Sequence, residues 1–212
     1  MNEKSKALFE AIAIGNVDAV IFLLINNRDL LGLRDNDDDT ILHKATQFNQ
    51  LKVLDLLTHF GLSINVTGCS CRTPLMVSVV EGSWSCFDLL TSKKANLEAR
   101  DTLNETILHK MASVGAVEAF NLLKQRYPMS RIEALLNLKN IVGSTPLMNA
   151  SHNGHYNMVM ALLMFGSKVD LFLTDDFGFT AFDMATTKGH HQVAQLLKLA
   201  MEQAQMQRQQ MV

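Results

Sequence analysis

The sequence is poor in cysteine, proline and tryptophan, with three, three and one of them in 212 residues. Cys69, Cys71 and Cys86 are odd in number, which excludes the fully paired disulfide framework of a small secreted protein. Only one residue separates Cys69 from Cys71, instead of the two of a zinc knuckle or redox pair, and no second pair exists. We therefore expect free thiols, no metal site and a cytoplasmic or nuclear location.

Charge and long apolar runs are also scarce. Charged residues make up 19% of the chain and nearly cancel, leaving a net charge of −2. The whole chain therefore has no electrostatic attraction for nucleic acid or anionic lipid. No apolar run approaches the roughly 20 residues that span a bilayer, and the first residues lack the apolar centre of a signal peptide. We expect neither nucleic-acid binding nor membrane insertion.

What the sequence does contain is an internal repeat. Related strings begin at five threonines, namely Thr40 (TILHKA), Thr73 (TPLMVS), Thr106 (TILHKM), Thr145 (TPLMNA) and Thr180 (TAFDMA). The steps between them are 33, 33, 39 and 35 residues. Nine residues after each threonine stands a second marker, which is Asn49, Gly82, Gly115, Gly154 or Gly189. With an earlier unit around Gly15, the chain has six units.

Each unit has the signals of two short helices. The threonine is a helix N-cap, and Pro74 and Pro146 follow at the first helical position, where a missing N–H costs nothing. The glycine ends this helix in a left-handed conformation, which Asn49 also tolerates. A second amphipathic helix and a polar turn complete the unit. Neither helix can bury its apolar face alone, so the copies must stack around a shared core.

This pattern resembles the ankyrin repeat. The resemblance rests on the 33-residue period, the Thr-Pro-Leu-His-like signature, the pairs Gly154-His155 and Gly189-His190, and the turn string Ala99–Thr106. It covers about residues 4–202. It implies an all-α ankyrin-repeat solenoid of about six helix–turn–helix repeats, with finger-like turns and a concave face.

The resemblance predicts a single domain over residues 1–202, followed by a polar, glutamine-rich tail over 203–212. The predicted units are about 4–35, 36–68, 69–101, 102–140, 141–175 and 176–202. The fourth unit carries about six extra residues, where we expect Pro128 to break or extend the linker after the second helix. The first unit lacks the threonine and resembles a cap. The tail either extends the last helix or frays.

The string TILHK occurs twice, so His43 and His109 could be catalytic groups or parts of the repeat. Their separation of 66 residues is two repeat lengths. In the resembled family this histidine forms hydrogen bonds within and between repeats, and we expect that role here. Met76 and Met148 occupy the equivalent position, and we expect methionine to be unable to make that hydrogen bond.

An enzyme finds little support in the sequence. A glycine separates His152 from His155, and the adjacent His190 and His191 point to different faces of a helix. No phosphate-binding glycine loop, nucleophile elbow or zinc-protease motif is present. The repeats also occupy the chain. We expect no catalytic activity, no metal and no cofactor.

Function is therefore expected at positions that the repeat itself does not need. Binding in the resembled family usually involves the fingers and the exposed side of the first helices. Apolar side chains on an open face indicate a contact site, although some could fold back onto a neighbouring finger. We predict ten partner-binding residues: Phe48, Val80, Leu103, Ile141, Val142, His152, Phe177, Phe179, Asp37 and Asp39.

Two further features allow alternative interpretations. The acidic run 35–39 could steer a basic partner segment, but such a run is more often a solvated turn before a helix. An extended peptide with basic and apolar parts would suit the expected concave face. Trp84 follows Gly82 by two residues, where the repeat buries an apolar side chain, so we expect it in the core.

The sequence thus predicts a non-enzymatic scaffold or adaptor that binds a partner protein or peptide on its concave face, with a monomer as the expected state. Three alternatives stay open. The chain could be a regulatory or inhibitory subunit that masks a partner's site, or a pathogen effector that acts on host proteins in the host cytosol. Asn65 also matches the position that is modified in members of the resembled family, so it could be a substrate for oxygen-dependent hydroxylation.

Overall fold

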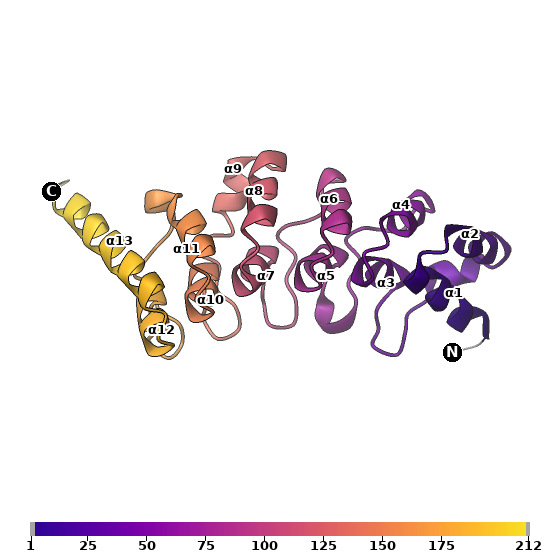
Figure 1. Cartoon of the computed structure of the whole chain (residues 1–212), viewed down its shortest axis with the longest axis horizontal. Helices are drawn as coiled ribbons and strands as arrows, with labels where there is room; N and C mark the ends of the chain where they lie inside the picture. Colours follow the sequence, from indigo (N-terminus) through magenta and orange to yellow (C-terminus); the bar gives the residue numbers. More distant parts are fainter. Residues whose placement is uncertain (1–2, 211–212) are drawn as a thin grey trace. The chain divides into compact units, whose positions relative to one another are not determined.

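The structure is a computed structural model that describes residues 3–210, except for the side chain of Gln210. Within this range the regular structure is helical, with one isolated bridge between Arg34 and Thr40. The prediction of an all-α fold is therefore confirmed. The chain divides into an N-terminal unit, Met1–Thr102, and a C-terminal unit, Leu103–Val212 (Figure 1). The single domain and the boundaries of its repeats stay predictions.

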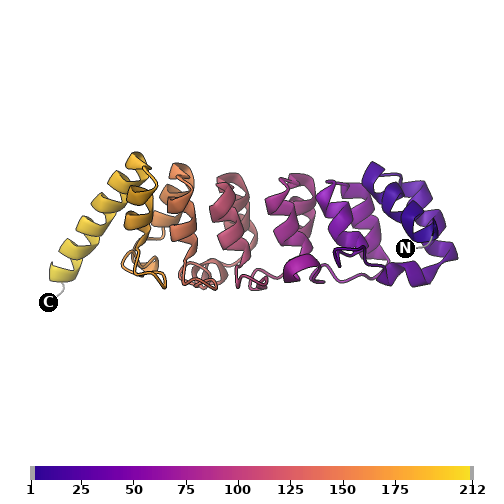
Figure 2. The same ribbon diagram turned by 90° about the horizontal axis from the view of Figure 1, so that it is seen from below.

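The N-terminal unit consists of three helix pairs: α1 (Glu3–Ile14) with α2 (Val17–Asn26), α3 (Ile41–Gln47) with α4 (Leu51–His59), and α5 (Pro74–Val80) with α6 (Trp84–Ser92). The first helices α1, α3 and α5 pack in one row, and the second helices α2, α4 and α6 in another (Figures 1 and 2). The core lies between the rows, where Leu54, Leu57, Phe87 and Leu90 are buried.

The C-terminal unit has the same arrangement, with α7 (Ile107–Val114) beside α8 (Val117–Arg126), α10 (Pro146–His152) beside α11 (Tyr156–Leu163), and α12 (Ala181–Thr187) beside α13 (His191–Gln210). The extra residues of the fourth unit form a short helix, α9 (Met129–Glu133), directly after Pro128. The predicted interruption at Pro128 is thus confirmed. The glutamine-rich segment continues α13 as far as Gln210.

The helix signals read from the sequence have the expected geometry. All five threonines are N-cap residues in extended conformation, and Pro74 and Pro146 occupy the first turn of α5 and α10. The glycines at the second marker have positive φ, and Asn49 adopts the same region with φ 52°. These caps fix the length of each first helix and therefore the place where each connecting turn begins.

The turns that precede α3, α5, α10 and α12 are narrow loops that we call fingers, formed by residues 35–39, 68–72, 140–144 and 175–179. Within each unit they leave the helix pairs from one end (Figures 1 and 2). Gly143 and Gly178 have φ of 78° and 84° at the penultimate position of their fingers. Asp38 and Cys71 hold the same position with positive φ despite carrying side chains, which costs backbone energy.

Candidate protein-interaction surface

His43 lies in the interior and joins two repeats. Its Nδ1 accepts hydrogen bonds from the hydroxyl of Thr40, at 2.8 Å, and from the amide of Thr40, at 3.3 Å. Its Nε2 donates to the carbonyl oxygen of Arg72 at 2.9 Å. Burial lowers the pKa of the ring. Both nitrogens are occupied by the fold, so the predicted structural role of His43 is confirmed.

His109 repeats this arrangement in the C-terminal unit. Its Nδ1 lies 3.0 Å from the Thr106 hydroxyl, and its Nε2 lies 3.2 Å from the carbonyl oxygen of Ser144. At the equivalent position the sulfur of Met148 accepts a hydrogen bond from the amide of Thr145 at 3.3 Å. Our expectation that methionine cannot make this bond is therefore wrong for Met148, because a thioether sulfur is a weak acceptor.

The apolar residues predicted for binding in the C-terminal unit lie exposed on its fingers and at its first residue. Phe177 is 74% exposed and Ile141 is 62% exposed, and Leu103, Val142 and Phe179 are also exposed. We call these five residues the apolar finger row. None of them is buried in the core, and the alternative that some of them pack on a neighbouring finger stays open. Their role in binding stays a prediction.

Short polar side chains hold the fingers of this row in shape. Oδ1 of Asp175 accepts hydrogen bonds from the amides of Phe177 and Phe179, at 3.0 and 2.8 Å. Oδ1 of Asn140 does the same for Val142 and Ser144, at 3.1 and 2.9 Å. Because these turns are fixed before any partner arrives, the aromatic side chains are presented without an ordering cost.

Backbone hydrogen bonds connect the members of the row. The amide of Ile141 donates to the carbonyl oxygen of Leu103 at 2.9 Å, and the amide of Asp176 donates to the carbonyl oxygen of Val142 at 3.1 Å. The row is therefore a continuous strip that spans successive repeats of the C-terminal unit. Asp176 is exposed beside it and was not among the predicted residues. The string Asp-Asp-Phe-Gly-Phe could have indicated it, as an Asx turn followed by an exposed acid.

A buried ionic network anchors this strip. Glu105 accepts hydrogen bonds from Lys110 at 2.6 Å, Asn140 at 3.2 Å and Asn149 at 3.0 Å. Burial by itself would raise the pKa of Glu105, but the hydrogen bond and charge of Lys110 and the two amides outweigh it, so the pKa is lowered. Glu105 thus joins the 140–144 finger to α7 and α10.

The predicted residues of the N-terminal unit are more scattered. Phe48 caps the C-terminus of α3, and Val80 is the last residue of α5, so both are exposed at equivalent ends of neighbouring helices. Asp37 is exposed at the tip of the 35–39 finger. Asp39 is only half-buried, and its Oδ1 accepts the amide of Cys69 at 2.8 Å. Asp39 therefore has a structural task as well.

Most of the acidic run has a partner within the fold. Lys44 lies 2.8 Å from Asp35, and Arg34 lies 3.1 Å from Asp38 while also bonding the carbonyl oxygen of Thr67. Burial alone would raise the pKa of Asp35, but its hydrogen bonds with Lys44 and the backbone lower it. These pairings favour the interpretation of the run as a charged turn over that of a steering site.

Three further histidines, His152, His155 and His190, lie at the junctions between first and second helices of the C-terminal unit. His152, a predicted binding residue, is exposed at the end of α10, and burial together with the charges of Lys188 and His190 lowers its pKa. His155 donates to the carbonyl oxygen of Ser113 at 3.0 Å, and His190 to that of His152 at 3.0 Å. The histidines of the Gly-His pairs therefore connect successive repeats. The ring of His155 faces Gly115, and the ring of His190 faces Gly154, which are the marker glycines one repeat earlier.

Trp84 corrects one expectation. Its side chain is 48% exposed at the start of α6, with the ring edge-on to the buried Phe87 at 6.2 Å between centroids. The sequence predicted a core residue there. At the first position of a second helix the side chain lies at the rim of the core, where the flat indole can contact Phe87 with one edge and solvent with the other.

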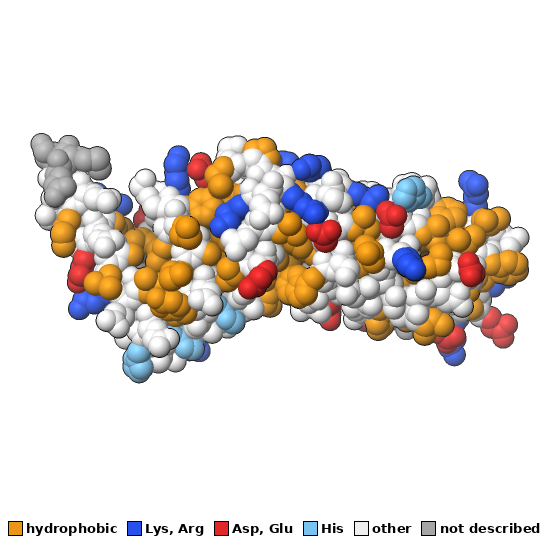
Figure 3. All heavy atoms as spheres, turned by 45° about the horizontal axis from the view of Figure 1, so that its top comes forward, with side chains coloured by type: hydrophobic (Ala, Val, Ile, Leu, Met, Phe, Trp, Pro, Cys, Tyr) orange, Lys and Arg blue, Asp and Glu red, His pale blue; other side chains and the backbone are white. Residues whose placement is uncertain are grey.

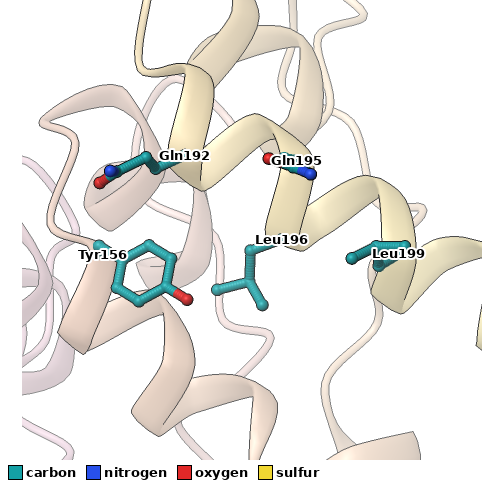
Figure 4. Close-up of a pocket in the computed structure, with 5 residues that line it drawn as sticks. All are labelled: Tyr156, Gln192, Gln195, Leu196 and Leu199. Atoms are coloured by element: carbon teal, nitrogen blue, oxygen red, sulfur yellow. The ribbon is translucent and has the colours of Figure 1, made fainter.

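The faces of the second helices carry their own apolar side chains, visible in Figure 3 among charged ones. An open groove of about 410 Å³ lies between α11 and α13, lined by Tyr156, Gln192, Gln195, Leu196 and Leu199 (Figure 4). A second one, of about 300 Å³, lies between α8 and α11. The lining of the first groove includes no carboxylate, histidine or cysteine, so it offers no acid–base pair for catalysis.

Residues 3–210 contain neither a metal-binding cluster nor a membrane-spanning helix. No group of three or more histidine, cysteine or acidic side chains lies close enough together to hold a metal ion. None of the described helices combines the length and the apolar composition needed to cross a membrane.

A family model of three ankyrin repeats matches residues 108–209. The matched residues belong to the ankyrin repeat family. It is 26% identical over 189 residues to YahD of Escherichia coli, a protein named for its ankyrin repeats, and this match covers 86% of the chain and 90% of that protein. Both the repeat signature and the helix pairs thus have their counterpart in known ankyrin repeat proteins.

Other relatives are far longer. The human cation channel "transient receptor potential subfamily A member 1" is 28% identical over 141 residues, and its Drosophila melanogaster counterpart is 25% identical over 163 residues. These matches cover 66% and 74% of this ankyrin repeat chain, but only 12% and 14% of the channels. The similarity therefore concerns a small part of each channel.

Two solved structures share the ankyrin fold. One is a chain in the complex of the predatory endopeptidase Bd0816 of Bdellovibrio bacteriovorus with the immunity protein Bd3460, with a TM-score of 0.77 and 24% identity over 91% of this chain and 97% of that one. The other is an ankyrin repeat domain from Acinetobacter baumannii, with a TM-score of 0.75 and 23% identity over 91% and 96%.

Proposed function

We propose that this ankyrin repeat chain is a non-enzymatic adaptor that binds a segment of a partner protein through the apolar finger row. Ankyrin repeats are generally protein-interaction modules, which supports the class of function. The row itself carries the proposal, because four of its five exposed apolar side chains stand on turns already fixed by Asn140 and Asp175. Fully burying one such side chain contributes roughly 1.5–3 kcal/mol, so a few of them suffice for specific binding.

The partner is a protein or peptide, and neither nucleic acid nor membrane insertion belongs to this function. The net charge of −2 supports this choice. The free cysteines Cys69, Cys71 and Cys86 suit a reducing compartment, so we place the protein in the cytoplasm or nucleus. The chain is proposed to act as a monomer.

A second candidate is a regulatory subunit that masks a partner's active site. It is favoured by the likeness to a chain from a complex between an endopeptidase and an immunity protein, which covers nearly the full length of both chains. Masking and bridging would use the same row. An inhibition assay of the partner, once identified, separates them.

The test replaces Phe177 and Phe179 with serine in the full chain. Proteins captured from an extract of the native host cell with the wild type should be lost with this double variant, while its urea unfolding midpoint stays unchanged, because both side chains are exposed. Met164→Ser is the matched control, since Met164 is 80% exposed but follows α11 instead of lying on a finger. Equal capture by all three proteins would refute the proposal.

A further inference from the structure

Successive fingers are joined by one recurring backbone hydrogen bond. In the C-terminal unit, Ile141 donates to Leu103 and Asp176 donates to Val142. In the N-terminal unit, the amide of Thr102 donates to the carbonyl oxygen of Ser70 at 2.9 Å. In the 140–144 finger the donor, Ile141, directly precedes the acceptor, Val142. The 140–144 finger therefore donates one amide to the preceding turn and offers the next carbonyl to the following finger. The 35–39 and 68–72 fingers are joined differently, because the amide of Cys69 donates to the carboxylate of Asp39.

Among residues 3–210, the 175–179 finger is the last of this series, and its acceptor is open. Asp176 is its donor, so the carbonyl oxygen of Phe177 is the acceptor that the pattern predicts for a following finger. Within residues 3–210 that oxygen receives no hydrogen bond. The exposed side chains of Phe177 and Phe179 lie on the same finger, and the Asp175 carboxylate accepts the amides of both residues. A backbone acceptor without a partner, on a finger that carries two exposed aromatic side chains, is a template for another extended chain.

We propose that the partner binds at the 175–179 finger as an extended segment that takes the place of a further finger. One of its backbone amides donates a hydrogen bond to the carbonyl oxygen of Phe177, and its neighbouring side chains pack on Phe177 and Phe179. This inference rests on the proposed function and specifies the partner's chemistry. The 140–144 and 175–179 fingers argue for this occupant, because the same bond already joins them to each other.

The composition of the segment follows from the surface it meets. In an extended chain every second side chain points to the same side, so aromatic or branched apolar residues at alternate positions can both contact the two rings. The carboxylate of Asp176 is exposed next to Phe177 and beside Gly143. A lysine or arginine near the apolar pair would complement this charge. We therefore expect a short segment of alternating apolar residues with a basic flank.

A library of random 12-residue peptides, displayed on phage and selected on the full-length chain, provides the probe. Enriched peptides should share the alternating apolar pattern with a basic flank, and they should bind Phe177→Ser at least about tenfold more weakly than the wild type, the loss that goes with about 1.4 kcal/mol. Met164→Ser should bind them like the wild type. Asp176→Asn should lower the affinity of the peptides less than Phe177→Ser does. Added salt should reduce the difference in affinity between Asp176→Asn and the wild type.

The backbone bond is tested with esters. In the best peptide each amide is replaced in turn by an ester, which removes one N–H donor without adding bulk, and affinity is measured by fluorescence anisotropy. One position should weaken binding by about fivefold to tenfold, as expected for the loss of a single hydrogen bond of about 1 kcal/mol or slightly more. That effect should be the same for wild type and Asp176→Asn, because the carbonyl is untouched.

The outcomes separate this inference from the proposed function. If the peptides depend on Phe177 but no ester weakens their binding, the backbone hydrogen bond to Phe177 is wrong, while the proposed interaction function stands. If no enriched peptide depends on Phe177, both are wrong. If the wild-type chain alone self-associates in analytical ultracentrifugation and Phe177→Ser does not, a second copy occupies the finger and the proposed partner segment is wrong.

Discussion

The Nε2 of His43 lies 2.9 Å from the carbonyl oxygen of Arg72, across the boundary between two repeats. The same ring accepts two hydrogen bonds from Thr40 at its Nδ1. One neutral imidazole thus caps its own helix and holds the finger of the next repeat. Protonation of Nδ1 would place a proton against the Thr40 amide, so the arrangement requires the neutral ring.

This requirement predicts acid sensitivity near neutral pH. Burial lowers the pKa of His43 in the folded state below its ordinary value of 6.5. As the pH falls below 6.5, the unfolded chain therefore binds the proton first, and the free energy of unfolding decreases until the folded pKa is passed. Above that window the contribution of His43 is fully present. Urea unfolding midpoints measured between neutral and mildly acidic pH should decline.

The control is His43→Met, because methionine fills the equivalent position at Met76 and Met148. This variant should lose part of the pH dependence, while the lowered pKa of His152 leaves a smaller slope of the same sign. His43→Ala should cost about 2–4 kcal/mol at neutral pH, from the lost hydrogen bonds and the cavity. An unchanged slope in His43→Met would contradict the assignment.

Gly154 and Gly189 allow the cost of an unfavourable backbone conformation to be separated from the cost of a side-chain clash. Gly154 and Gly189 have nearly the same backbone, with φ of 72° and 75°. A Cβ at Gly154 would lie 2.5 Å from the His190 ring, whereas nothing lies within 4 Å of one at Gly189. Gly189→Ala should therefore cost about 1 kcal/mol, from the backbone alone. Gly154→Ala should cost about 2–4 kcal/mol, since it also displaces the ring from its bond with His152.

Chemical denaturation of both variants gives the comparison directly. Nuclear magnetic resonance of the His190 ring adds a local readout, because its signals should shift in Gly154→Ala and stay in place in Gly189→Ala. Equal losses of stability would show that the conformation of the glycine, and not its contact with the histidine, decides the cost.

Glu105 connects the 140–144 finger of the apolar finger row to α7 and α10. Glu105→Ala should destabilise the C-terminal unit by about 3 kcal/mol, because it removes a carboxylate that Lys110, Asn140 and Asn149 all contact. Glu105→Gln keeps the shape and should cost about half as much. Since the pKa of Glu105 is lowered, its contribution is present above about pH 4.5 and is lost as the pH falls further. Hydrogen exchange at residues 140–144 should rise in the alanine variant, and unchanged exchange there would refute the anchoring role.

The sequence was sufficient to predict those features that depend on a single residue and not on its neighbours in the fold. The threonine begins the first helix whether proline, isoleucine or alanine follows it, and the glycine or Asn49 nine residues later ends it. The helices α3, α5, α7, α10 and α12 were therefore predictable. The exposed apolar fingers were predictable by elimination, since the repeat has no use for Phe177 or Phe179. Their exposure agrees with that argument.

Features that depend on a neighbour could not be read in this way. Trp84 occupies a position whose periodicity indicates burial, but its distance from the core axis depends on how α6 packs. The sulfur of Met148 accepts a hydrogen bond only because Thr145 places an amide 3.3 Å away. The open carbonyl of Phe177 is a backbone property without any side-chain signal, and it becomes visible only when the bonds between earlier fingers are known.

The three cysteines should divide two to one in reactivity. Cys86 is fully buried, its thiol lies 3.8 Å from the carbonyl oxygen of Ala45, and burial raises its pKa to about 12. Cys71 is exposed and Cys69 is half-buried on the 68–72 finger. Because the thiolate is the reacting species, the native protein should react with Ellman's reagent at two thiols, and the third should follow only in denaturant. Cys71→Ser should lower the number of fast-reacting thiols by one, whereas Cys86→Ser should leave that number unchanged. Three fast-reacting thiols in the native wild type would contradict the prediction, because the core around α6 would then open far more readily than its packing implies.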